Sequence, residues 1–350
     1  MYSESDLQSA VSAGVLSHEA AEAFRAHAAG MRSAPVADEE HFRLITGFND
    51  IFVSIAAVLL LAAAAGIGAA IAPGVAGLLV AGAAWMLAEF FTRKRRMALP
   101  SIILLLAFVG GVAAVPINIL AETEPHLSNQ ASTMIGAGIG LLAAAAAWFH
   151  WRRFMVPITV AAGAAGIAVT AMALVVSAWM GMTGNRDPEP ILLPLVFISG
   201  LAVFALAMRW DMSDPKRETR RSDVAFWLHL LAAPMIAHPL FNWLGVNEGE
   251  NIGALAAVGV LAIYVLMGAV ALAVDRRALL VSALAYVLVA LTWLFREFGM
   301  VELNVALTGL VIGSALLALS AFWTPIRSAL VQRLPGQLQT MLPQGTLAAA

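Results

Sequence analysis

The stretch Val224–Leu244, VAFWLHLLAAPMIAHPLFNWL, decides the fold. It is long and apolar enough to cross a bilayer, because about 20 apolar residues form one helical crossing. It also contains two histidines, two prolines and an asparagine: His229, His238, Pro234, Pro239 and Asn242. Ionisable and helix-breaking residues at membrane depth are where spanning proteins concentrate their function. The stretch therefore predicts a membrane protein and a first candidate site.

The composition of the whole chain agrees with this prediction. Of 350 residues, 61% are apolar and 12% are charged, whereas globular proteins average roughly 45–50% and about 25%. The chain has no cysteine, which excludes disulfides, thiolate metal sites and cysteine nucleophiles. A net charge of −2 gives no indication of a nucleic-acid partner. The expected partner is the lipid bilayer.

Ten apolar segments are long enough to be spans, and the short gaps between them carry turn signals. The pattern predicts an all-α fold, a polytopic transmembrane helix bundle of about ten spans. The predicted spans are residues 48–71, 74–91, 99–120, 133–149, 156–180, 191–208, 224–244, 252–274, 278–295 and 303–323.

The basic residues alternate between the gaps. If the N-terminus is cytoplasmic, all but Arg186 and Arg296 of the 20 Lys and Arg residues fall on the cytoplasmic side. The outside loops carry Glu122, Glu124, Glu248 and Glu250 instead. Because cytoplasmic loops are enriched in Lys and Arg, the pattern predicts a multi-pass protein of the cell inner membrane with both termini cytoplasmic.

Two segments are predicted to lie outside the membrane. Residues 1–47 form a cytoplasmic helical hairpin and linker, residues 48–323 the transmembrane domain, and residues 324–350 a cytoplasmic tail. In the hairpin, Gly14 ends the first helix and Ser17 starts the second. Its apolar stripe of Leu7, Val11, Val15 and Leu16 is too large for so short a hairpin to bury. We expect residues 1–30 to contact the membrane domain, a second copy in a homo-oligomer, or a cytoplasmic partner.

The hairpin also carries the one family resemblance in the chain. The sequence LQSAVSAGVLSHEAAEAF, followed by a linker and spans rich in Ala, Gly and Leu, resembles the uncharacterised bacterial inner-membrane proteins of the DUF2157 type. The pattern is formed by Gly14, Val15, Leu16, Ser17, Glu19 and Ala20, and the match covers about the first seventy residues. The resemblance implies a multi-pass membrane protein with no assigned activity.

Paired glycines recur inside the predicted spans. Gly136 and Gly140 lie four residues apart in an apolar segment, where small residues let helix backbones approach closely. The same interpretation applies to Gly66/Gly68, Gly110/Gly111 and Gly163/Gly166. These pairs predict tight helix contacts and not a phosphate-binding loop.

Polar residues within the spans fall at two levels once the orientation is set. Glu89, His150 and His229 lie toward the cytoplasm, and Asn118, His238, Asn242, Arg296 and Glu297 lie toward the outside. Glu89 lies about one turn from the RKRR run at 93–96. It either pairs with those basic residues at the interface or faces the bundle interior as a proton- or cation-coupled site.

The two histidines of the first stretch cannot act together on a straight helix. His229 and His238 are nine residues apart, which places them on opposite faces, while His238 and Asn242 share a face. We therefore predict no metal site. His238, with Pro239 crowding the carbonyl of Met235, either forms a titratable polar site with Asn242 or fills a hydrogen-bonding gap in a bent helix.

These observations leave two classes of function. The sequence contains no Ser/His/Asp constellation, paired acid set or HExxH spacing, so nothing in it argues for an enzyme, and no cofactor is predicted. In one hypothesis the protein is a transporter of a small solute or ion. The candidate intramembrane polar site is then His238, Asn242, His229, Glu89, Asn118, Arg296 and Glu297. In the alternative, it is a membrane scaffold or sensor that acts through the N-terminal hairpin.

Overall fold

The computed structural model describes residues 4–24, 48–123, 127–185, 187–215, 217, 219–245, 254–297 and 303–342. The chain divides into two compact units, Met1–Phe42 and Arg43–Ala350. Within the described residues every regular element is helical.

The first unit contains the hairpin. Helix α1 (Glu4–Ser12) ends before Gly14, which has a left-handed φ of 71°. Residues 18–24 form the next helix, capped by the Ser17 hydroxyl, which accepts a hydrogen bond from the amide of Ala20 at 3.1 Å. The stripe predicted from the sequence is only partly covered, because Leu7 is buried whereas Val15 is 77% exposed.

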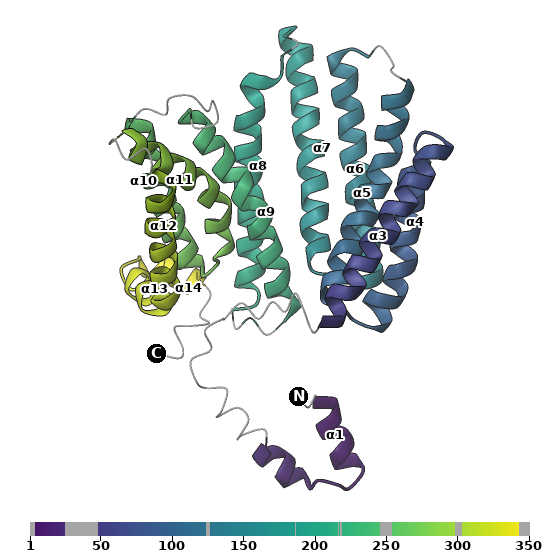
Figure 1. The fold of residues 1–350 in the computed structure, drawn as a ribbon, viewed down its shortest axis with the longest axis vertical. Helices are drawn as coiled ribbons and strands as arrows, with labels where there is room; N and C mark the ends of the chain where they lie inside the picture. The colour runs from purple at the N-terminus through teal and green to yellow at the C-terminus, as the bar shows by residue number, and fades with distance from the viewer. Residues whose placement is uncertain are drawn as a thin grey trace. The chain divides into compact units, whose positions relative to one another are not determined.

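The second unit is a bundle of long apolar helices (Figure 1). In chain order these are α3 (Phe48–Ile71), α4 (Val75–Ala88) with the π-helix η1 (Glu89–Lys94), α5 (Ala98–Thr123), α6 (Asn129–Phe154), α7 (Ile158–Thr183), α8 (Glu189–Met212), α9 (Arg220–Trp243), α10 (Ala254–Val274), α11 (Ala278–Glu297), α12 (Asn304–Ala321), α13 (Trp323–Val331) and α14 (Gly336–Met341).

Each of the ten predicted spans coincides with one of these long helices. In the described part of the chain, eight helices are long and apolar enough to cross a membrane. The other two are α11, whose apolar core is shorter, and α12, which passes only together with α13. Large apolar side chains such as Leu59 and Leu317 lie on the outer surface, 66% and 74% exposed, as lipid contact requires. The protein is therefore an integral, multi-pass membrane protein with an all-α bundle fold.

The tenth span differs from its prediction at its end. α12 stops at Ala321, and α13 leaves it at an angle of 73°. Pro325 has no amide hydrogen to bond the carbonyl of Ala321, so the helix cannot continue straight. Buried Trp323 and Arg327 instead anchor α13 against the turn between α10 and α11.

Glycines lie at the closest helix contacts, as the sequence predicts. In each glycine pair named above, however, only one of the two glycines touches the backbone of a neighbouring segment. A Cβ on Gly140 would lie 2.9 Å from the carbonyl oxygen of Gly166, so α6 and α7 touch backbone to backbone there. Gly77 and Gly111 bring α4 and α5 together in the same way. Gly136 has open space around it, because it faces away from this contact.

The bundle has two parts, α3–α7 and α8–α13, which meet where α7 packs against α8 and α9. Helices α3–α5 pack on one another, and α6 packs on α5 and α7. α7 also packs against α8 and α9, and α9 continues the core into α10, α11 and α12. Among the eight helices that are long and apolar enough to cross a membrane, α9 is the most buried: 50% of its apolar segment is covered, against 17% for α5 and α8. The stretch that decides the fold is therefore also its central helix.

Candidate functional site

A buried ion pair lies at one end of α8 and α9. This is the end where the Arg-rich turns lie, and we call it the basic end. Asp211, in the last turn of α8, and Arg276, in the turn between α10 and α11, are 0% and 2% exposed. Arg276 donates through Nη2 to Oδ1 of Asp211 and through Nε to Oδ2 at 3.2 Å. Its Nη2 also donates to the carbonyl oxygen of Ser222 at 3.1 Å. Such a pair is tolerated in an interior only when its geometry and hydrogen bonds are this complete.

His229 on α9 is the third member of the group. Its Nε2 lies 2.9 Å from Oδ2 of Asp211, its ring is fully buried, and the ring of Phe204 stands edge-on to it with centroids 5.2 Å apart. Its Nδ1 is buried and has no hydrogen-bond partner among the described residues. A neutral imidazole has one N–H. If Nε2 carries it toward Asp211, Nδ1 presents a bare lone pair that can accept a proton.

We call these three residues the Asp211–His229–Arg276 cluster. A second ion pair, between Arg217 and Asp275, lies next to it. Asp275, next to Arg276, accepts a hydrogen bond from Nη1 of Arg217 at 3.0 Å and one from Nε1 of Trp323 at 2.7 Å. Arg327 lies 3.6 Å from the same carboxylate. The sequence between α8 and α9 thus meets the α10–α11 turn and α13 in one polar network at the basic end.

Backbone strain accompanies this network. Arg217 and Asp275 have left-handed φ values of 55° and 61°, a conformation that costs roughly 1–3 kcal/mol when the surroundings must hold it. Arg217 is held by three donated hydrogen bonds, to the Asp275 side chain and to the carbonyls of Val274 and Asp275. Burial lowers the pKa of Arg217, and the nearby charge of Arg276 lowers it further. The left-handed conformations of Arg217 and Asp275 are therefore held by the hydrogen bonds of the polar network.

A second histidine is buried near the same end of the other part of the bundle. His150, at the end of α6, is fully buried and lies among the rings of Trp85, Phe108 and Phe154, with centroids 6.2, 5.8 and 4.6 Å away. Its Nδ1 is 3.4 Å from the hydroxyl of Thr159, and its Nε2 has no hydrogen-bond partner in the described structure. His150 therefore has an aromatic environment, whereas His229 has a charged one.

Glu89 lies in an exposed ion pair. Both of its carboxylate oxygens are engaged by Arg153 on α6, at 2.6 and 3.0 Å, and Arg93 approaches at 3.2 Å. The interaction with Arg93 matches the interpretation that Glu89 pairs with the RKRR run. The two-pronged contact with Arg153 is an addition that the sequence does not indicate. Because the side chain is 32% exposed, this pair lies at the rim of the bundle.

The outer-level residues are separate from the cluster. His238 is exposed, and its Nδ1 lies 2.7 Å from the hydroxyl of Tyr286, which links α9 to α11. Asn242, one turn on, and Asn118 on α5 are half-buried. The side chains of Arg296 and Glu297 lie outside the described residues. His229 and His238 do face opposite ways, one buried and one exposed, and the special role of His238 stays a prediction.

The sequence analysis missed most of the cluster. It nominated His229, counted Arg217, Arg276 and Arg327 only among the basic residues of the cytoplasmic loops and tail, and did not consider Asp211. One signal could have found part of it. Asp275 stands directly before Arg276 and Arg277, and an acid beside arginines at a helix end is a candidate internal partner. Asp211 gives no such signal, because Asp214, Glu218 and Asp223 lie in the same segment.

The arrangement suits proton exchange and charge pairing more than metal binding. Among the described residues, no group of three or more His, Cys, Asp or Glu could hold a metal ion. Comparison of the chain with protein-family models, with curated proteins and with solved structures finds no match. The resemblance of the hairpin to DUF2157-type proteins therefore stays a prediction.

Proposed function

We propose that the protein is a proton-coupled transporter of a small solute or ion, and that the Asp211–His229–Arg276 cluster is its proton-binding site. The observation that carries the proposal is the fully buried ring of His229, with one nitrogen on Asp211 and the other without a described partner. Ionisable residues inside spans are costly, and they commonly form proton relays in transporters.

Protonation of the cluster would change its charge balance. With a neutral ring, Asp211 and Arg276 compensate each other. A proton on Nδ1 would add a positive charge close to Arg276 and Arg217, which already act on the ring, with Asp211 as the opposing group. Excess buried charge costs several kcal/mol, so the protonated cluster favours a conformation in which water reaches it. A proton is then coupled to a structural change at the basic end.

The orientation follows from the same basic residues. We place the basic end on the cytoplasmic side of a bacterial inner membrane, because the positive-inside rule and the DUF2157 resemblance both favour that placement. The proton would then be exchanged with the cytoplasm when the basic end opens. The pairs Arg276 with Asp211 and Arg217 with Asp275 would separate in the open state.

Proton movement in proteoliposomes tests the proposal. The full chain is reconstituted with a pH-sensitive dye inside, and inward gradients of amino acids, sugars, organic acids and monovalent cations are applied in turn. We expect at least one class to drive a change of internal pH. That change should be lost in His229→Gln at normal abundance, since glutamine can still hydrogen-bond Asp211 but cannot take a proton.

His150→Gln is the matched control, because His150 is also a fully buried histidine but contacts no carboxylate in the described structure. It should keep the solute-driven pH change. A pH change that persists in His229→Gln, or the absence of one with every solute class in the wild type, contradicts the proposal.

A second candidate function rests on the hairpin. Val15, Leu16 and Phe24 are 77%, 36% and 45% exposed in the first unit, which is unusual for apolar side chains on so small a module and typical of a contact surface. In this hypothesis the protein is a scaffold or sensor, and residues 1–30 bind a second copy or a cytoplasmic partner. Val15→Ser with Phe24→Ser should reduce oligomer size or partner capture in cross-linking, while abundance in the membrane stays normal.

A further inference from the structure

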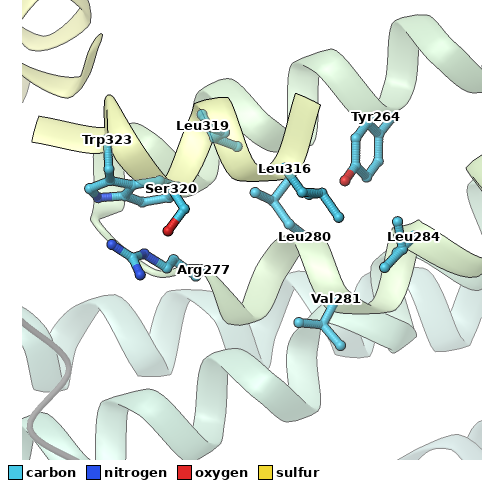
Figure 2. Close-up of a pocket in the computed structure, with 9 residues that line it drawn as sticks. All are labelled: Tyr264, Arg277, Leu280, Val281, Leu284, Leu316, Leu319, Ser320 and Trp323. Carbon is cyan, nitrogen blue, oxygen red and sulfur yellow. The ribbon is translucent and has the colours of Figure 1, made fainter. Parts of the chain in front are cut away.

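A groove of about 170 Å³ lies between α10, α11, α12 and α13 (Figure 2). Its walls are aliphatic: Leu280, Val281, Leu284, Leu316 and Leu319. It exists because α12 packs on α11 but bends away at Phe322 into α13. The groove does not include any member of the Asp211–His229–Arg276 cluster.

The groove faces the lipid side of the bundle. Val281 on its wall is 63% exposed, so acyl chains are the molecules within reach. Its two ends are Arg277, just after α10, and Tyr264 within α10. The helix rises about 15 Å from Tyr264 to Val274, because the ten steps between them rise about 1.5 Å each. That is half of a hydrocarbon core of about 30 Å, or the depth of one leaflet.

The two ends of the groove differ in chemistry. At the basic end, the guanidinium of Arg277 lies 5.0 Å over the ring of Trp323, whose Nε1 is fixed by Asp275 at 2.7 Å. The Ser320 hydroxyl lies beside them (Figure 2). At the deep end, the Tyr264 hydroxyl points into the groove and is buried without a partner in the described structure. Arg277 and Trp323 suit an anionic headgroup at the membrane interface, and the aliphatic walls suit its acyl chain. Together they fit an anionic amphiphile.

We propose that this groove binds an anionic phospholipid from the leaflet at the basic end. One acyl chain lies along Leu280, Leu284 and Leu316, and the phosphate accepts hydrogen bonds from Arg277 and Ser320. Guanidinium suits phosphate because its planar fork donates two parallel hydrogen bonds. Stacking on Trp323 fixes that fork before the lipid arrives, which lowers the entropy lost on binding. The inference is independent of proton transport.

Native mass spectrometry of the full-length protein in detergent tests this site. The protein is titrated with phosphatidylglycerol or phosphatidylcholine that have the same acyl chains, and the affinity of the tightest lipid is measured. We expect the wild type to prefer phosphatidylglycerol by about fivefold, the factor that one basic residue gives at an anionic membrane surface. Arg277→Gln should remove this preference, and Arg277→Lys should keep only part of it, because lysine retains the charge but not the planar fork.

Two further variants separate the groove from general surface charge. Leu316→Trp fills the slot and should weaken the tightest binding of both lipids. Arg152→Gln is the matched control, because Arg152 also lies over an indole, that of Trp148 at 5.2 Å, but in the other part of the bundle. It should leave the preference unchanged. Equal affinity of the wild type for both lipids, an unchanged preference in Arg277→Gln, or an equal loss in Arg152→Gln overturns the proposal. If Arg277→Gln does not fold, unaltered lipid binding by Leu316→Trp overturns it.

Discussion

The two parts of the bundle bury the same residue type in opposite surroundings. In α3–α7, His150 lies among three aromatic rings and one hydroxyl. In α8–α13, His229 lies against Asp211, which Arg276 also holds. Each ring has one nitrogen without a described partner. The two histidines therefore differ in the charge around them and not in their burial. Under the proposed function, the charged surroundings of His229 are what would couple its protonation to a structural change.

The same contrast extends to how each part is held together. The α6–α7 contact is made by backbone approach at Gly140 and Gly166 and by uncharged polar side chains such as Thr170, which donates to the carbonyl of Ala137 at 3.1 Å. The α8–α13 part is closed by charged turns, Arg217 to Asp275 and Arg276 to Asp211. Contacts of the first kind depend on close packing, whereas those of the second kind depend on charge, which is the property that the proposed function requires.

The largest expected effect comes from removing the shared carboxylate. Asp211→Asn leaves Arg276 buried without a counter-charge, and it should lower the free energy of unfolding by about 3–5 kcal/mol. Denaturation in mixed micelles measures this. The double variant Asp211→Leu with Arg276→Met should recover most of the loss, because it removes both charges. An Asp211→Asn protein as stable as the wild type would show that the pair is not buried as described.

Matched substitutions at the two histidines should separate the two parts directly. His229→Phe removes a hydrogen bond from the buried carboxylate of Asp211, so it should cost about 1–3 kcal/mol. His150→Phe places a ring among rings and loses only the long contact to Thr159, so it should cost less than about 1 kcal/mol. The same unfolding measurement compares them. Equal losses would remove the distinction between a charged and an aromatic environment.

Packing in the α6–α7 contact should respond to a single methyl group. Gly140→Ala places a Cβ 2.7 Å from the Thr170 hydroxyl, and the helices must separate at a cost of order 1 kcal/mol, the low end of overpacking. Gly136→Ala, on the same helix but with nothing within 4 Å of the added carbon, should cost nothing. If both variants are equally stable, the backbone contact is looser than described.

The smallest effect is expected at Glu89. Glu89→Gln breaks the pair with Arg153 at the rim, but exposed pairs contribute little because water and salt screen them. Unfolding should be nearly unchanged, and any difference should shrink as salt is raised. A large, salt-independent loss would place Glu89 in the interior with Asp211 and support its alternative role as a coupled site.

Hydropathy predicts the helices of this chain well and its polar network poorly. The ten spans depend on local composition, and each coincides with a helix. Asp211 and His229 are 18 residues apart, and Asp211 and Arg276 are 65 apart, so only the packing of α8, α9 and the α10–α11 turn brings them together. Basic residues near helix ends also have two roles. Arg276 supports the orientation prediction, yet its side chain is inside the bundle.

His238 shows the limit of single-helix reasoning. Two prolines mark its surroundings as special, and α9 nevertheless runs unbroken from Arg220 to Trp243. The partner that satisfies its ring is Tyr286, on another helix, and no pattern within α9 indicates a residue 48 positions away. Burial, which separates His229 from His238, likewise depends on neighbouring helices.

The bend between α12 and α13 also affects the order in which the protein is built. Trp323 and Arg327 follow every other residue of the network in the chain, so they are the last of its members to be synthesised. Until α13 folds back, Asp275 has Arg217 but neither of these later partners. The polar network at the basic end can therefore be completed only after α12 has been made.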